Sequence, residues 1–266
     1  MITLTLLEKI YSKNKKMAIQ SFKENIQFQL SKLKVKINEV NLNSRDWLKI
    51  EIAGEDEEAA AKYLEKQYGS SPIHINQIKI PSSIRGRIIN TNKSGNEIYI
   101  DVGVMYPEPI NSFVTLKKLR SQLADGKNLS INQIRNLFCL HEHLPLEVLL
   151  TKKIREKNQI KAELTQRVIK TFHQWVSWRF DRIIISGTDQ TKVKYAIDKT
   201  KVKRYLNKIE KLGFLEHSLV CKIGVDAPGI IFKIGHHLKN APIYVFSPRR
   251  ITTELSPVWI EERLNK

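Results

Sequence analysis

The sequence predicts an α+β protein in three parts, in which two units of element order βαββαβ flank a small β-barrel with helical insertions. Both end regions alternate between the hydrophobic periods of strands and of helices, whereas the region between them is rich in short strands and turns. Pro81-Ser82-Ser83 separates the first two parts. We expect domains over residues 1–82, 83–155 and 181–266, with a linker helix over 156–180.

The first part begins with a strand, because Ile2, Leu4 and Leu6 alternate with polar residues. Apolar residues from Ile19 to Leu33 then recur every three or four positions, which predicts a helix. Two strands, a second helix with an acidic first turn at 55–58, and a last short strand from Ile73 to Ile80 follow. This order is that of the ferredoxin-like, split βαβ fold.

The short strands and turns of the second part predict a barrel of the OB class. A turn at 92–96 joins two alternating strands into a hairpin. A third strand is expected near Val114, helices over about 116–123 and after the candidate cap Ser130, and a closing strand over 146–154.

The third part again approaches βαββαβ. A short apolar strand near Ile184 precedes a helix whose buried face is Val193, Ala196 and Ile197. Later, a strand over 218–224 leads to a helix capped by Asp226, and a last strand covers 243–246. Residues 201–213 leave two alternatives: their apolar spacing favours a helix, whereas the ferredoxin-like order needs a strand. We favour the strand, paired through a hairpin at 212–215.

Composition points to a polyanionic partner. The chain has 266 residues, 45 Lys and Arg against 27 Asp and Glu, and a formal net charge of +18. No apolar run approaches the roughly 20 residues that cross a bilayer, and the N-terminus lacks signal-peptide features, so we expect a cytoplasmic protein that binds no membrane. A basic amphipathic helix from Ile160 to Phe180 is the membrane-surface alternative. Two cysteines exclude a four-cysteine zinc site.

The positive charge increases along the chain. Basic and acidic residues number 13 and 10 over residues 1–80, 11 and 6 over 81–155, and 21 and 11 over 156–266, giving +3, +5 and +10. We therefore expect phosphate binding mainly in the third part and secondarily on the barrel, while the first part serves packing or a protein partner. The candidate nucleic-acid-binding residues are Lys192, Lys194, Lys199, Lys201, Lys203, Arg204, Lys208, Lys211 and Lys233, with Arg85, Arg87, Lys93, Tyr99, Lys117, Lys118 and Arg120 on the barrel.

Three segments resemble known families. Gly86 to Val102, with its glycine start, its turn and its Ile-Tyr-Ile-Asp-Val ending, resembles the opening hairpin of ribosomal-protein-type OB-fold RNA-binding domains. This resemblance implies base stacking on Tyr99 and Phe113. The run 212–229, together with the chain length, resembles an uncharacterised archaeal family of unknown function, which implies no catalytic residue. Residues 228–235 resemble the helix-loop-helix of KH domains, although the glycines stand farther apart than in the Gly-X-X-Gly loop.

Other chemistry has weaker support in the sequence. Cys139, His141 and His143 alternate and would share one face of a strand, but a fourth metal ligand is not evident, so we expect no metal and no cofactor. The two helices of the second part could form a DNA-binding helix-turn-helix that presents Gln133 and Arg135. No phosphate-cradling loop or nucleophile elbow is present.

The leading interpretation is therefore a non-catalytic RNA-binding protein that acts on structured or ribosomal RNA, with ribosomal particles as a possible partner. A DNA-binding or transcription-associated protein is the first alternative, and a nuclease is the second.

Overall fold

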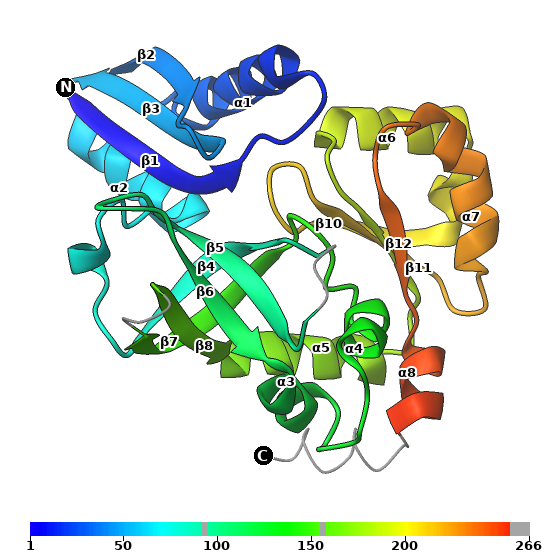
Figure 1. Ribbon diagram of the computed structural model, residues 1–266. Coiled ribbons are helices and arrows are strands. Elements are labelled where there is room, and N and C mark those ends of the chain that lie inside the picture. The colour runs from blue at the N-terminus through cyan, green and yellow to red at the C-terminus, as the bar shows by residue number, and fades with distance from the viewer. Residues whose placement is uncertain (92–94, 155–157, 256–266) are drawn as a thin grey trace.

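The computed structural model describes residues 1–91, 95–154 and 158–255. Three parts meet around a common centre (Figure 1): an N-terminal unit, a barrel and a C-terminal unit. In the described residues, no helix is long and apolar enough to cross a membrane.

The N-terminal unit is a three-stranded antiparallel sheet in the order β1-β3-β2 with two helices. Its core joins the inward residues of the sheet to those of the helices, among them Ile50, Phe22 and Leu64. Its elements are β1 (Ile2–Lys9), α1 (Lys15–Gln29), β2 (Val35–Leu42), β3 (Trp47–Gly54) and α2 (Glu57–Tyr68).

The expected sixth element of this unit, a strand from Ile73 to Ile80, is wrong. Ser70 makes an isolated bridge to Leu6, and the chain then crosses to the barrel, where the backbone of Ile73 accepts hydrogen bonds from Met105 and Tyr106. A short 3-10 helix, η1 (Ile75–Gln77), follows. Pro72 lacks the N–H that a ladder would need, and the barrel edge takes the hydrogen bonds that a fourth strand would have supplied.

The barrel is closed, with the strand order β4-β5-β6-β8-β7. Ladders between neighbours are antiparallel except for the parallel pair β6 and β8. Helices α3 and α4 lie between β6 and β7, and the predicted cap Ser130 accepts from the backbone N–H of Gln133. The elements are β4 (Ser82–Ile89), β5 (Glu97–Val104), β6 (Ile110–Thr115), α3 (Leu116–Leu123), α4 (Ile131–Leu137), β7 (Pro145–Ile154) and β8 (Gln159–Leu164).

The helix expected over 156–180 is wrong in its first part. Ile160, Ala162 and Leu164 are buried in alternation, the period of a strand, and β8 completes the barrel. The helix α5 (Gln166–Ser177) begins only after Thr165, whose side chain accepts from the N–H of Val168.

The C-terminal unit has the order βαββαβ and a four-stranded antiparallel sheet, β10-β11-β9-β12. The strand favoured within 201–213 is confirmed: a 3-10 turn takes its first residues, and β10 then pairs with β11 across the predicted hairpin. The elements are β9 (Arg182–Ile185), α6 (Gln190–Lys199), η3 (Val202–Tyr205), β10 (Leu206–Lys211), β11 (His217–Cys221), α7 (Ala227–Ile234), η4 (Gly235–His237), β12 (Ile243–Phe246) and α8 (Pro248–Leu255).

This sheet packs against other elements on both of its faces, and the helices α6 and α7 cover one of them. Ile183 and Ile185 pack with the inward residues of α6 and α7, whereas Ile184 and Phe246 belong to the core of the barrel. Successive strand residues point to opposite faces, so one sheet serves two cores. Helices α6 and α7 therefore form a layer on the side away from the barrel (Figure 1).

Candidate nucleic-acid interface

The outer helical layer, defined as α6, η3, α7, η4 and the connection 200–201, carries seven of the nine cations predicted in the third part of the chain. Val193, Ala196 and Ile197 are buried against the sheet as expected, which turns the cations of α6 outward. Across these elements the sequence has seven Lys and Arg and one acidic residue, Asp198, while Asp189 and Asp226 cap the starts of α6 and α7. All seven cations are exposed: Lys192, Lys194, Lys199, Lys201, Lys203, Arg204 and Lys233.

Aromatic rings lie among these cations. Tyr195 is 54% exposed, and the Lys199 Nζ lies 5.6 Å from its ring centroid. The ring of Tyr205 lies 4.8 Å from the Arg204 guanidinium and 5.5 Å from the Lys233 Nζ. Tyr205 itself is half-buried. Accessible rings beside cations offer stacking and charge at the same place, which is how proteins hold single-stranded nucleic acid.

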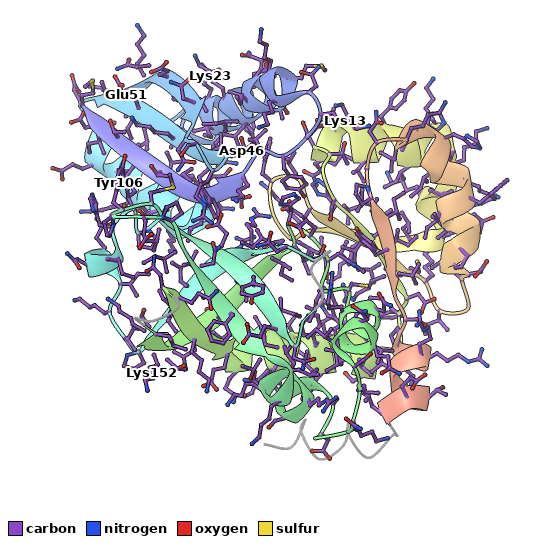
Figure 2. All side chains as sticks on the ribbon, in the orientation of Figure 1. Lys13, Lys23, Asp46, Glu51, Tyr106 and Lys152 are labelled. Atoms are coloured by element: carbon purple, nitrogen blue, oxygen red, sulfur yellow. The ribbon has the colours of Figure 1, made fainter. Side chains whose placement is uncertain are left out.

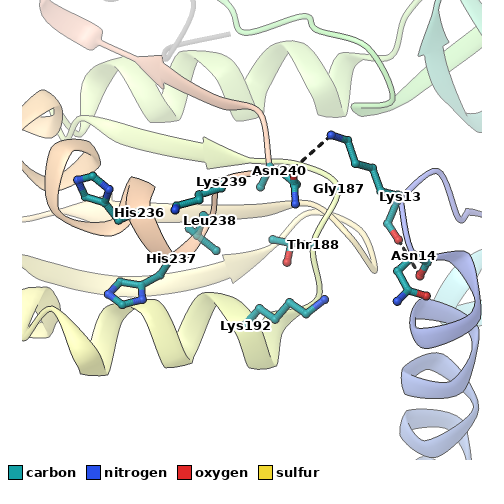
Figure 3. Close-up of a pocket in the computed structure, with 12 residues that line it drawn as sticks. Lys13, Asn14, Gly187, Thr188, Lys192, His236, His237, Leu238, Lys239 and Asn240 are labelled. Atoms are coloured by element: carbon teal, nitrogen blue, oxygen red, sulfur yellow. Dashed lines mark hydrogen bonds between the residues drawn. The ribbon is translucent and has the colours of Figure 1, made fainter.

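A cleft of about 340 Å³ opens at the edge of this layer, between the N-terminal and C-terminal units (Figure 3). We call it the interdomain cleft. None of the twelve residues that line it is acidic. Its cations are Lys13, which precedes α1, Lys192 on α6, and Lys239 after η4, and the rings of His236 and His237 add to the lining. Lys13 and Lys239 were not predicted from the sequence. Only the fold brings residue 13 to the C-terminal unit (Figure 2).

Lys208 and Lys211 lie on β10, the edge strand of the sheet, and not on the helical layer. Lys208 pairs with Glu210 at 2.7 Å and lies 5.6 Å from the ring of Trp178, which is 46% exposed. Trp178 is a third residue that the sequence did not indicate. The Lys211 Nζ lies 5.4 Å from the ring of Tyr68 in the N-terminal unit, and burial lowers the pKa of this lysine.

The barrel candidates are dispersed. Lys117 is exposed, but Lys118 pairs with Glu163, and the Arg120 Nε donates to the carbonyl of Leu129 at 2.7 Å. These two cations stabilise their own surroundings. Lys93 lies outside the described residues.

The two aromatic side chains expected to stack bases on the barrel differ in accessibility. Tyr99 is half-buried, and its hydroxyl donates to the Glu97 carboxylate at 2.8 Å; this hydrogen bond raises the pKa of Tyr99. Phe113, its cross-strand partner, is only 4% exposed. Base stacking on Phe113 is therefore wrong, because its ring is not accessible.

Arg87 is fully buried and cannot contact phosphate. Its guanidinium pairs with Glu8 from β1 and with Glu216 from the turn before β11. Tyr11 donates to Glu216 and accepts from the N–H of Gly187 at 3.1 Å. We call Glu8, Tyr11, Arg87 and Glu216 the central charge cluster. It joins all three parts of the chain, and so a residue predicted for binding has a structural role.

Electrostatics within the cluster follow from burial. Desolvation alone would lower the pKa of Arg87, but the adjacent carboxylates of Glu216 and Glu8 raise it. Burial raises the pKa of Glu216, against the opposing effect of Arg87. Burial and Glu216 together raise the pKa of Tyr11 well above its usual value. Arg85 lies at the rim, where it donates to the carbonyl of Leu212 and lies 3.9 Å from Glu8.

The expected strand through Cys139, His141 and His143 is absent. Cys139 and His143 have left-handed backbone with φ of 52° and 65°, and they belong to the connection between α4 and β7. The imidazoles of His141 and His143 stack on Tyr244 and Tyr11 at 3.5 and 3.8 Å between centroids. In the part of the chain that the structure describes, no group of three or more His, Cys, Asp and Glu could hold a metal ion.

In the structure, Gln133 is not available for the base contact that the helix-turn-helix alternative expects of it. The Gln133 side chain accepts from the backbone N–H of Ser130 at 2.7 Å, which completes a capping box at the start of α4. A side chain that caps its own helix is not free to reach base edges.

Comparison with known families accounts for most of the chain. The DUF2110 N-terminal domain matches residues 3–74, the DUF2110 central domain residues 79–176, and the DUF2110 C-terminal domain residues 180–246. The chain belongs to the DUF2110 family. The resemblance to a family of unknown function is thereby confirmed, while its archaeal setting stays a prediction. No curated protein matches the chain in sequence.

Two solved structures are similar to parts of the chain. One is from the a/eIF2alpha–aDim2p–rRNA complex of Pyrococcus horikoshii OT3, at 13% identity and a TM-score of 0.25, covering 47% of this chain and 64% of that chain. The other is the intact alpha subunit of aIF2 from Pyrococcus abyssi, at 8% identity and a TM-score of 0.25, covering 63% of this chain and 97% of that chain. This chain therefore spans less than two thirds of the first of these chains.

Proposed function

We propose that this DUF2110 protein is a non-catalytic RNA-binding protein that holds phosphate on its outer helical layer. One observation carries the proposal: seven exposed cations share a layer with the rings of Tyr195 and Tyr205, and the acidic residues of this layer are Asp198 and the two helix caps. Cations on one side of a molecule can reach successive phosphates of one strand, whereas scattered cations cannot.

Structured or ribosomal RNA is the proposed partner, and the cytoplasm the proposed location. The barrel has the strand order of an OB fold, with the third and fifth strands parallel, and the C-terminal unit has the ferredoxin-like order. Both are modules that recognise RNA by shape, backbone and stacking. Tyr195 and Tyr205 supply rings on the helical layer in place of the buried Phe113, and Trp178 supplies a ring beside Lys208 of the edge strand β10.

The test is RNA binding as a function of salt. We expect the wild-type protein to bind a structured ribosomal RNA fragment with a log–log salt slope of roughly −5, if about six phosphates are contacted. A variant with Lys194→Ala, Lys199→Ala and Lys203→Ala should bind at least ~10-fold more weakly and lose ~2 to 3 units of slope.

The matched control removes three exposed lysines of the N-terminal unit, Lys32, Lys36 and Lys62, so both variants have the same net charge. The control should bind within about 2-fold of wild type. Equal weakening in the two variants would mean that the helical layer is no binding surface. Tighter binding to duplex DNA than to RNA would favour the DNA-binding alternative, and divalent-dependent cleavage would favour the nuclease.

A further inference from the structure

We infer that the interdomain cleft holds a phosphate group of the bound RNA, so that one ligand contacts the N-terminal and C-terminal units together; this inference rests on the proposed function. Lys13 approaches from the first unit, and Lys192 and Lys239 from the other (Figure 3). The volume of the cleft, about 340 Å³, falls in the range of small-ligand sites.

The cations of the cleft are not neutralised in the way that other lysines of this protein are. Lys9 pairs with Asp101 and Lys15 with Asp46, each at 2.5 Å. Lys13, by contrast, donates to the amide oxygen of Asn240 at 3.3 Å, which positions the ammonium across the cleft but supplies no negative charge (Figure 3). Among the described residues, no carboxylate lies within 4 Å of the Nζ of Lys13 or Lys239.

Lys192 has one carboxylate neighbour, Asp189, which already accepts a hydrogen bond from a backbone N–H. The nearest oxygen of Asp189 lies 3.7 Å from its Nζ, and the other oxygen accepts from the N–H of residue 192 at 3.1 Å as a helix cap. An anion in the cleft would be able to take over both Lys13 and Lys192, because neither is held by a close ion pair.

The backbone adds to this potential. Asn14 stands at the beginning of α1, so a helix of 15 residues with a neutral cap starts at the lining of the cavity, whereas the start of α6 is already capped by the Asp189 carboxylate. Helix N-termini carry partial positive charge and favour anions. Cations from two units and the start of α1 therefore surround a cavity whose lining has no acidic side chain.

The first experiment uses the full-length protein and inorganic phosphate. We expect phosphate to shift the amide resonances of Asn14, Gly187 and Thr188 in NMR spectra at constant ionic strength. Lys13→Ala with Lys239→Ala should weaken this binding at least ~10-fold, because two of the cations around the ligand are lost. Lys32→Ala with Lys36→Ala, which removes the same charge from exposed positions outside the cleft and the helical layer, should leave it within ~2-fold. Equal effects of the two pairs, or no shifts at these amides, overturn the inference.

The second experiment identifies the source of the phosphate. Bound RNA should shift the same amides and prevent further change by inorganic phosphate. RNA that binds tightly but leaves these amides unchanged would overturn the inference while the proposed function stands. If inorganic phosphate binds at the cleft and no RNA binds the protein, the proposed function fails, and with it the assignment of the phosphate to RNA.

Discussion

Replacement of Arg87 by methionine tests the structural role of the central charge cluster. The side chains of Arg87 and Glu216 are 0% exposed, and that of Glu8 is 2% exposed. The variant keeps most of the volume of Arg87 but leaves the buried Glu216 carboxylate without a cation and the buried Glu8 carboxylate with only the Arg85 guanidinium, 3.9 Å away. Water cannot reach the two carboxylates. Tyr11 and the N–H of Phe214, which donates to Glu8 at 3.1 Å, remain as their donors.

Loss of one partner from a buried ion pair costs about 3–5 kcal/mol, since the remaining charge stays desolvated. For a chain of this size a loss of 1 kcal/mol lowers Tm by roughly 2–4 °C, so we expect a decrease of roughly 6–20 °C. Burial already raises the pKa of Glu216 in the wild type, and Arg87 opposes this effect. Without Arg87 the folded-state pKa rises further, so the folded variant binds a proton more readily than the unfolded chain.

The loss of stability in Arg87→Met relative to wild type should therefore grow as pH rises through the folded pKa and shrink toward pH 5. Urea denaturation at pH 5 and pH 8 measures both values. Lys117→Met, an exposed barrel cation, is the control and should change stability by less than about 0.5 kcal/mol. Glu216→Gln added to Arg87→Met should recover part of the loss. A loss below 1 kcal/mol, or one that is equal at the two pH values, would refute the assignment.

Three further predictions concern buried groups. A Cβ at Gly213 would lie 1.9 Å from the Glu216 Oε2 and 3.0 Å from the Arg87 guanidinium, so Gly213→Ala should lower the free energy of unfolding by about 1–3 kcal/mol. Gly235 has open space around its Cβ position, so Gly235→Ala should leave stability unchanged. Equal unfolding midpoints for the two variants would contradict this prediction. Burial lowers the pKa of His141, His143 and His217 to about 4. The stability that these neutral rings contribute is therefore present above pH 6.5 and is lost as the pH falls toward 4. In NMR spectra their imidazole resonances should not titrate between pH 8 and 5.5. Burial raises the pKa of the Cys139 and Cys221 thiols to about 12, and both should resist a thiol reagent at pH 8 until urea unfolds the protein; rapid reaction of the native chain would show that they are accessible.

Local patterns were sufficient for most of the fold. The caps Ser130 and Asp226, the inward face of α6 and the hairpin between β10 and β11 are all present as predicted. These features depend on residues within a few positions of one another, where period and capping chemistry decide. The strand expected after Pro72 and the helix expected at 159–164 failed because their partners are distant: the barrel edge attracts the first segment, and β6 and β7 pair with the second.

The sequence predicted which cations of the candidate site point outward, but it did not predict which residues the fold brings together there. Spacing places Lys194 and Lys199 opposite the buried face of α6, and the structure has them exposed. No spacing distinguishes Arg87 from these cations, because its burial depends on Glu8 and Glu216, which lie 79 and 129 positions away. Lys13 and Asn240 are likewise 227 positions apart, so the cleft exists only in the folded chain.

The central charge cluster and the interdomain cleft are physically connected through Tyr11. Its hydroxyl donates to Glu216 in the cluster and accepts from the N–H of Gly187, which lines the cleft. Lys13 follows two residues later, so the same contact that satisfies a buried carboxylate also fixes where Lys13 stands relative to Lys192. Buried charges are costly unless they are fully paired, which makes their arrangement nearly unique. A cation held by such an arrangement approaches its ligand with less conformational entropy to lose than one on a mobile surface chain. The buried arginine that does not bind nucleic acid thereby anchors the segment that carries Lys13, one of the lysines proposed to bind it.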